Sequence, residues 1–410
     1  MIFFPLYIDP GTGSMLFSLA IGIATAGVFA LRSLVIKFKF IFSGGKADKT
    51  EKDKIPYVIY SDHKRYWNVF KPICDEFEKR GIDLLYLTQS EDDPFLSYNY
   101  THIRTEFIGE GNKGFSKLNF LNAGILLSTT PGLDVYQWKR SKNVKCYVHI
   151  PHSADELAGY RMFGLDYYDA VLATGENQVD LIRKIENLRP GIVKKEIVTV
   201  GSITLDNLKK RYDSVPKREK NENPVVLLAP SWGVSGILSR YGAKLLSALQ
   251  QTGFKIIVRP HPQTVISERN TLEVLEKQFS DIEWNYDNDN FEVLNKADVL
   301  ITDFSGIIFD FACVFDKPLI YADTSFDTLP YDADWLSEQR WSFKVLPEIG
   351  IKLEKDCIEN VKNLIQDAME SKNLQEGRNK IRKECWTNIG NSAVKAVDYL
   401  VEKQMEISKK

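Results

Sequence analysis

Two histidines stand where a strand is expected to end and a rigid turn to begin. His152 lies in residues 150–153 (Ile-Pro-His-Ser), and His261 lies in residues 259–262 (Arg-Pro-His-Pro). An imidazole just past the carboxyl end of a strand can reach a ligand cleft and exchange a proton there. We predict that His152 is a general base, with a plain loop histidine as the alternative. We predict that His261 and Arg259 meet a diphosphate whose charge rises during transfer, with a structural histidine as the alternative.

The strongest pattern lies in residues 297–312. An apolar strand ends at Thr302 and Asp303, and a tight turn then opens a helix at Ser305 and Gly306. The free N–H groups and partial positive charge of a helix start suit a phosphate. We predict donor-phosphate binding by Asp303, Ser305 and Gly306. An ordinary helix cap has the same residue pattern, so both interpretations stay open.

Weaker signals follow other expected strands. Ser231 and Trp232 come after the strand at 224–230, where the indole is placed to pack on a base or sugar. Thr130 follows the strand at 124–128, on the expected acceptor side. Simple turn chemistry explains these residues equally well. His149 has apolar neighbours within a strand and is interpreted as a core histidine.

The loop at 109–114 has the spacing GxGxxG after a strand. A dinucleotide site is not favoured, because the acidic residue at a suitable distance, Asp134, lies beyond a further strand. A flexible loop near the acceptor, with Lys113 available to an anion, and a plain surface loop both stay open as interpretations.

Composition narrows the function classes. The 410 residues carry a net charge of only −2, which does not favour a nucleic-acid binder, so an anionic partner must be met by a local site. The five cysteines form no CxxC pair and are expected to be reduced buried thiols of a cytosolic protein. Asp332 and Asp334 have metal-binding DxD spacing but stand alone in a polar loop. No metal or cofactor is implied.

The amino-terminal segment is apolar in character. Residues 15–31 lack charge, and lysines follow the segment but do not precede it. We predict a membrane anchor over residues 1–42 and a basic linker over 43–54, with the rest of the chain in the cytoplasm. A helix lying in the membrane surface and a cleaved signal peptide are the alternatives.

From residue 55 onward, short apolar strands alternate with helical stretches, which is typical of an α/β protein with parallel sheets. We predict two Rossmann-like domains facing each other across a cleft, at residues 55–208 and 224–385. The charged residues 209–223 are predicted to link them, and a closing helix is expected at 386–410. Ligands of such sheets bind outside the carboxyl ends of the strands.

Together these segments resemble the CDP-glycerol glycerophosphotransferase family, the polymerases and primases of teichoic-acid-like polymers. The resemblance rests on residues 297–321, on 228–232 (Leu-Ala-Pro-Ser-Trp) and on 259–262. It implies a GT-B-like fold, and it implies a base at His152 and a donor-phosphate residue at His261. The first histidine stands in Ile-Pro-His-Ser here rather than in the family's Trp-His-Gly, which leaves the acceptor open.

The resemblance implies a membrane-associated enzyme that moves glycerol phosphate, or a related polyol phosphate, from a CDP-activated donor to a hydroxyl of a lipid-linked or polymer acceptor. Two alternatives stay open. One is a GT-B glycosyltransferase that uses a nucleotide sugar, and the other is a catalytically silent scaffold in a polymer-assembly complex.

Overall fold

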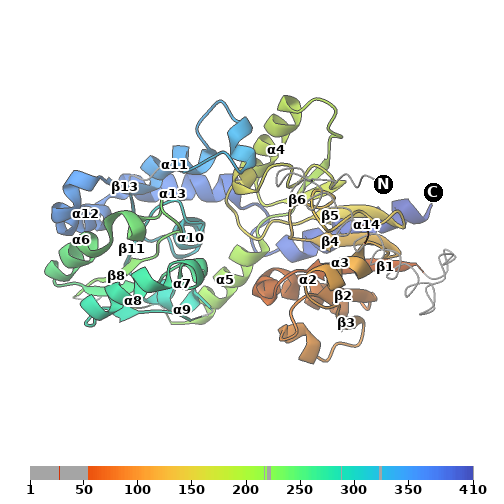
Figure 1. Ribbon diagram of the computed structural model, residues 1–410, viewed down its shortest axis with the longest axis horizontal. Helices are drawn as coiled ribbons and strands as arrows, with labels where there is room; N and C mark the ends of the chain where they lie inside the picture. Colours follow the sequence, from red (N-terminus) through yellow and green to blue (C-terminus); the bar gives the residue numbers. More distant parts are fainter. Residues whose placement is uncertain are drawn as a thin grey trace, which may run out of the picture. The chain divides into compact units, whose positions relative to one another are not determined.

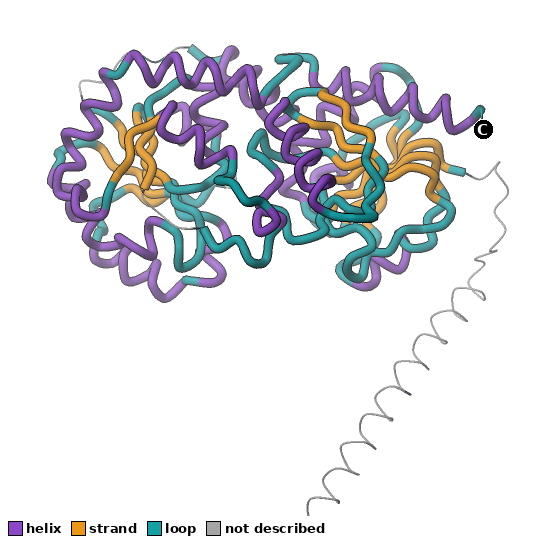
Figure 2. Tube along the Cα trace, turned by 90° about the horizontal axis from the view of Figure 1, so that it is seen from above, coloured by secondary structure: helices purple, strands orange, loops and turns teal. Residues whose placement is uncertain are grey.

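Two parallel β-sheets carry the fold (Figure 1). The computed structural model describes residues 27, 54–216, 218, 223–287, 289–322 and 326–409, and residues from Ile55 onward form one compact unit. We call the first sheet with its covering helices the N-terminal half, and the second sheet with its helices the C-terminal half. In both views the strands of each sheet lie between layers of helices (Figure 2).

The first sheet has the strand order β3-β2-β1-β4-β5-β6-β7. Its strands are nearly all apolar because both faces are covered. Alternate residues of β1 point to opposite faces, so Tyr57 and Ile59 join one core while Val58 and Tyr60 join the other. The strands are β1 (Ile55–Ser61), β2 (Leu84–Thr88), β3 (Ile103–Phe107), β4 (Ala123–Ser128), β5 (Val144–His149), β6 (Ala170–Ala173) and β7 (Glu196–Thr199).

The helices of this half include three short 3₁₀ turns. The elements are η2 (Lys64–Tyr66), α2 (Trp67–Lys79), η3 (Pro94–Ser97), α3 (Asn112–Leu118), η4 (Leu157–Gly159), α4 (Glu176–Leu188) and α5 (Ile203–Ser214).

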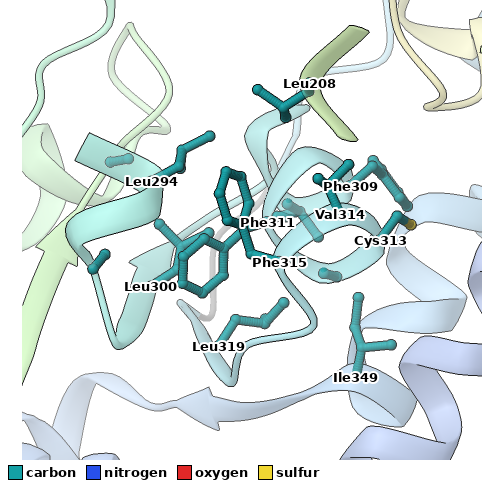
Figure 3. Close-up of a cluster of buried hydrophobic side chains, with 14 of the residues drawn as sticks. Leu208, Leu294, Leu300, Phe309, Phe311, Cys313, Val314, Phe315, Leu319 and Ile349 are labelled. Carbon is teal, nitrogen blue, oxygen red and sulfur yellow. The ribbon is translucent and has the colours of Figure 1, made fainter. Parts of the chain in front are cut away.

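The second sheet has the order β10-β9-β8-β11-β12-β13. One of its cores gathers the phenylalanines of the π-helical turn η5 against β11 and β12 (Figure 3). The strands are β8 (Val225–Leu228), β9 (Lys255–Val258), β10 (Glu283–Trp284), β11 (Val299–Thr302), β12 (Leu319–Ala322) and β13 (Gly350–Leu353). The helical elements are α6 (Ile237–Gln251), α7 (Pro262–Ser267), α8 (Arg269–Gln278), α9 (Phe291–Lys296), α10 (Ile307–Asp310), η5 (Phe311–Phe315), η6 (Asp332–Trp335), α11 (Trp341–Ile349), η7 (Lys355–Asn360), α12 (Val361–Glu370) and α13 (Lys372–Cys385).

The chain crosses between the halves twice. Helix α5 begins with Ile203 in a core of the first sheet and continues with Leu208 in a core of the second. The last helix, α14 (Ser392–Ser408), returns to the first sheet, where Leu400 joins the same core as Ile203. The two crossings tie the halves together through shared apolar burial.

The predicted α/β architecture with parallel sheets is confirmed. Strand β13 was missed because Gly350 and Lys352 break the apolar run. Residues 209–214, predicted as linker, form the end of α5, while the domain limits themselves stay predictions. The predicted anchor and basic linker lie outside the described residues, save for residue 27 and Lys54. None of the helices described is both long and apolar enough to cross a bilayer.

Candidate active site

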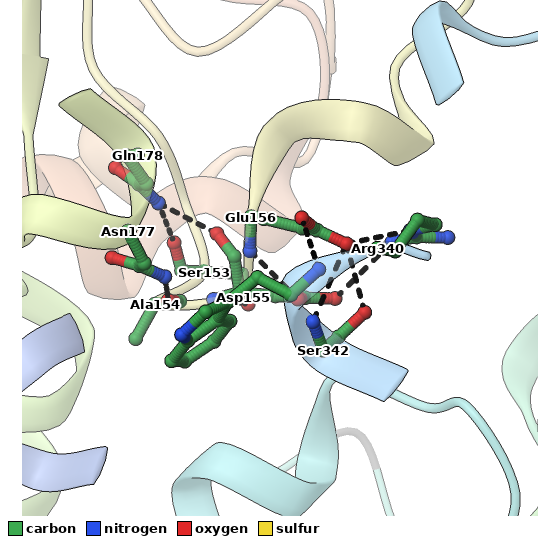
Figure 4. Close-up of polar contacts among 9 residues, drawn as sticks. Ser153, Ala154, Asp155, Glu156, Asn177, Gln178, Arg340 and Ser342 are labelled. Carbon is green, nitrogen blue, oxygen red and sulfur yellow. Dashed lines mark hydrogen bonds and ion pairs between the residues drawn. The ribbon is translucent and has the colours of Figure 1, made fainter. Parts of the chain in front are cut away.

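Helix α4 holds the loop that carries His152. This loop follows β5, and His152 itself is exposed to solvent. The buried amide of Gln178 donates to the carbonyls of Ser153 (3.0 Å) and Asp155 (2.7 Å), as Figure 4 shows. Asn177 beside it donates to the carbonyl of Ala154 at 3.0 Å. A loop that would otherwise be free is therefore held in one conformation at the edge of the sheet.

The same loop is held from the C-terminal half. The buried carboxylate of Glu156 accepts from Arg340 Nε at 2.8 Å and from the Ser342 hydroxyl at 3.0 Å (Figure 4). It also accepts from the backbone N–H of Trp341 at 2.9 Å, at the start of α11. The Glu156 carboxylate thus forms an ion pair with a buried cation and also accepts a hydrogen bond from a backbone N–H group at the start of a helix, where such groups lack partners within the helix. The base predicted in one half is positioned by residues of the other.

The surroundings of His152 keep its imidazole neutral at physiological pH. Its ring lies 5.2 Å, between centroids, from the ring of Tyr66. The protein packed around it, followed by the nearby Arg65 cation, lowers the pKa of His152 to about 4 although the side chain remains accessible. A neutral imidazole that ligands can reach is able to accept a proton.

His261 is also neutral, and its tautomer is defined. Its Nδ1 accepts from the backbone N–H of Gln263 at 3.1 Å, which caps α7. Partial burial, and then Arg65, lower the pKa of His261. Because Nδ1 is an acceptor, the proton of the neutral ring sits on Nε2, and this nitrogen is a donor suited to a phosphate oxygen. Arg65 acts on both histidines, so both lie near one cation.

The helix start predicted to hold phosphate lies against the His152 loop. A Cβ placed on Gly306 would lie 3.3 Å from the Ser153 hydroxyl oxygen. Gly306 has φ −59°, which any residue adopts, so space and not backbone conformation favours glycine here. Ser305 precedes it and is partly exposed. The structure therefore brings Gly306 to the loop of the predicted base.

Two residues predicted to bind donor phosphate are engaged elsewhere. The buried carboxylate of Asp303 accepts from the backbone N–H groups of Ser231 (3.0 Å) and Ile237 (2.8 Å). Arg259 donates to the Asn285 side chain and, at 2.8 Å, to the Asp287 carbonyl. These contacts show that Asp303 and Arg259 position the loops around the site. Arg259 keeps further N–H donors beyond these two bonds, and the donor-phosphate roles of both residues stay predictions.

The four weaker predictions are spread along the strand ends. Ser231 is buried by its contact with Asp303, whereas the neighbouring Trp232 side chain is 48% exposed. Thr130 follows β4, next to β1 and β5 in the sheet. Lys113 is exposed in α3, which follows the edge strand β3, two strands from β1. The buried His149, bonded through Nε2 to the Tyr160 hydroxyl at 3.0 Å, is confirmed as a core histidine.

Other candidates were missed from the sequence. Asp62, Arg65 and Tyr66 directly follow the buried strand β1, and this position is the signal that marks them. Asp310, in the segment at 297–312, has its pKa raised to about 7 by burial, and Asn290 donates to it at 3.2 Å. Asp332 of the DxD pair is buried and paired with Arg189, which gives it a structural role.

Comparison with known proteins gives matches to solved structures and to one protein family. The comparison with curated protein sequences gives no match. The fold is similar to that of the wall teichoic acid polymerase TagF, at 14% identity and TM-score 0.59, over 93% of this chain and 99% of that one. It is also similar to a UDP-GlcNAc 2-epimerase from Methanocaldococcus jannaschii, at 15% identity and TM-score 0.52, over 85% and 99%. These likenesses confirm the GT-B-like fold.

The sequence itself supplies the family. Residues 191–401, more than half of the chain, match the family described as CDP-glycerol:poly(glycerophosphate) glycerophosphotransferase. This region contains His261, Ser305 and Gly306, the residues that carried the resemblance. The chain therefore belongs to the CDP-glycerol:poly(glycerophosphate) glycerophosphotransferase family and is a transferase of that type.

Proposed function

We propose that this protein transfers a glycerol-phosphate or related polyol-phosphate unit from a CDP-activated donor to a hydroxyl of a lipid-linked or polymer acceptor. Membership of the family supports the donor. The likeness of the fold to a wall teichoic acid polymerase supports synthesis of a teichoic-acid-type surface polymer.

The chemistry is a direct displacement at phosphorus. The donor diphosphate lies against Ser305 and Gly306, with His261 Nε2–H donating to it. Neutral His152 takes the proton of the acceptor hydroxyl, whose oxygen forms a bond to the β-phosphorus. The bond from that phosphorus to the bridging oxygen breaks, and CMP leaves with the electron pair. Donors fixed in place before the reaction stabilise the charge that develops on the phosphoryl oxygens.

The observation that carries the proposal is the contact between the His152 loop and the helix start at Gly306. A general base and a phosphate-binding site can act in the same displacement only if the acceptor hydroxyl at the base lies close to the donor phosphorus at the phosphate site. The position of Ser153 beside Gly306 supports such an arrangement, because His152 is the preceding residue.

A donor assay tests the proposal. The full chain in detergent is incubated with an acceptor and, separately, with CDP-glycerol, CDP-ribitol and UDP-sugars, and CMP and UDP are quantified. Release of CMP is expected, with a loss of about 10²–10⁴-fold in His152→Ala, as for removal of a general base. Release of UDP alone would favour a glycosyltransferase. Polymer synthesis in cells that survives replacement of His152 and His261 would favour a silent scaffold.

The membrane location belongs to the same proposal. Residues 14–42 would anchor the chain, and the lysines that follow would keep the catalytic part on the cytoplasmic side. Fractionation of cells that express the full chain tests it. The protein should stay with membranes after a carbonate wash, and a chain that starts at Asp53 should not.

A further inference from the structure

Several buried polar atoms lie together at the carboxyl ends of β1 and β4. Among the described residues, Asp62 Oδ1, Thr129 Oγ1 and Thr130 Oγ1 are buried and make no hydrogen bond of ordinary geometry, while the Thr130 hydroxyl lies close enough to act on the Asp62 carboxyl and favour its charged form. Tyr60 pairs with Ser128 in the parallel register, so two residues further on Asp62 lies beside Thr130, on the same face of the sheet. Proteins rarely bury such atoms unpaired, and a ligand or ordered water normally satisfies them.

The adjoining segment presents a cation on the same side as the base. Arg65 is exposed, and its guanidinium carbon lies 5.6 Å from the centre of the Tyr66 ring, which in turn packs on His152. His63 fixes this turn, since its Nδ1 accepts from the Arg65 N–H at 3.1 Å and its carbonyl from the Tyr66 N–H at 3.1 Å. Within the described chain, Arg65 forms no ion pair with a carboxylate.

The chemistry of these groups selects the ligand. A carboxylate beside a threonine hydroxyl binds groups that both donate and accept, as vicinal hydroxyls do. A guanidinium a few residues away suits a phosphate. The donor's diphosphate is already assigned to Ser305, Gly306 and His261, so a second anion contact in the N-terminal half belongs to another molecule. A polyol phosphate combines the required groups.

We infer that Asp62, Thr130 and Arg65 form a subsite for the terminal polyol-phosphate unit of the acceptor. Asp62 and Thr130 hold its hydroxyls, and Arg65 holds its phosphate. Tyr66, between Arg65 and His152, sets the distance from the bound phosphate to the base. The inference rests on the proposed function and adds to it the chemistry by which the acceptor is recognised.

Steady-state kinetics with a synthetic glycerol-phosphate trimer as acceptor and CDP-glycerol as donor test the subsite. For Arg65→Gln and Asp62→Asn we expect the KM for the trimer to rise about tenfold or more, on the scale of one lost charged contact. The Kd for CDP-glycerol, measured by calorimetry without acceptor, should rise much less than the KM for the trimer, because Arg65 acts on the donor site only through its charge near His261. A structural defect would weaken the binding of both ligands equally. Arg65→Lys should recover part of the loss.

Arg104, exposed on the edge strand β3, offers a matched control, and Arg104→Gln should leave both constants unchanged. An unchanged trimer KM in Arg65→Gln and Asp62→Asn, or an equal loss of donor affinity, would overturn the subsite. If the unaltered chain releases no CMP at all, the proposed function fails separately. Calorimetric titration of the trimer then decides the subsite: weaker binding in Arg65→Gln supports it, and equal binding overturns it.

Discussion

The hydroxyl oxygen of Ser153 lies 3.3 Å from where a Cβ on Gly306 would stand, and this contact joins the two halves at the candidate site. Ser153 follows the predicted base, and Gly306 opens the predicted phosphate-binding helix. The Ser153 hydroxyl also accepts from the backbone N–H of Asp155 at 3.2 Å, so it has little freedom to move away. A side chain added at Gly306 therefore affects both the donor site and the loop of the base.

We expect Gly306→Val to weaken CDP-glycerol binding by about 1–3 kcal/mol, the scale of stranding a polar partner, and to lower kcat as well. Gly306→Ala should have a much smaller effect, because one carbon at 3.3 Å needs a shift of only a few tenths of an ångström. Calorimetry and CMP release measure the two effects, and circular dichroism checks the fold. Undiminished donor affinity in a well-folded Gly306→Val protein would place the phosphates elsewhere.

The pH dependence of the reaction should report the lowered pKa of His152. A general base is active when deprotonated, and with a pKa of about 4 His152 stays so down to about pH 5. We therefore expect kcat/KM to stay flat from pH 8 to about 5, where an ordinary histidine would already have lost its activity near pH 6.5. Below pH 5 activity should fall as His152 becomes protonated.

The variant Arg65→Gln separates the two causes of this shift. Removing the cation should move the acid limb to higher pH, although not to 6.5, because the protein packed around the ring is the larger cause of the lowered pKa. The rate of CMP release is measured between pH 4.5 and 8 in both proteins. The pH at which the acid limb falls can then be compared even if the two proteins differ in overall rate. Coincident limbs near pH 6.5 in both proteins would contradict the assignment of His152.

The sequence was sufficient for most strands of the two sheets, although not for β13, and for the place of the histidines relative to these strands. Strands buried on both faces are short apolar runs, and residues that follow such runs fall at the carboxyl edge of a parallel sheet. His152 and His261 could be placed in this way without knowledge of any contact.

The partners of individual side chains could not be predicted. Asp303 and Arg259 have residue types that suit a phosphate site, but the backbone and side chains that engage them lie 20 or more residues away along the chain. Asp62 and Arg65 were missed for the related reason that their meaning depends on neighbours in β4 and on His152. Strand order and register, which bring these residues together, are not encoded in any local pattern.

Breaking the buried ion pair between the halves should be costly. The side chains of Arg340 and Glu156 are only 9% and 2% exposed. Within the part of the chain that the structure describes, Glu156→Gln leaves the buried cation with Asp155, 3.8 Å away, as its only ionic partner. We expect a loss of about 3–5 kcal/mol in the free energy of unfolding, measured with urea.

A surface pair between the same halves provides the comparison. Lys184 and Glu338 are 52% and 42% exposed, so Glu338→Gln should lower the free energy of unfolding far less than Glu156→Gln does. The double variant Glu156→Gln with Arg340→Met should be more stable than Glu156→Gln alone, because it removes the unpaired charge. Equal losses in the buried and surface variants would show that the Glu156 pair does not hold the loop.

Gln178 should govern catalysis without touching substrate. Its amide donates to the carbonyls of Ser153 and Asp155 and accepts from the backbone N–H of Thr174 at 2.9 Å. Gln178→Glu has the same shape but turns the donor into an acceptor that repels both carbonyls. Displacement of the His152 loop by about an ångström can cost on the order of 10²-fold in rate, so we expect kcat to fall tenfold or more.

The Kd for CDP-glycerol should hardly change in Gln178→Glu, because Ser305, Gly306 and His261 lie in the other half. Asp180→Asn, on the exposed face of the same helix, is the matched control and should behave as the unaltered enzyme. The kinetic constants are compared with donor calorimetry and with thermal melting. A positioning role predicts that kcat falls while donor affinity holds. Parallel losses of rate, donor affinity and melting temperature would instead identify Gln178 as a residue of general stability.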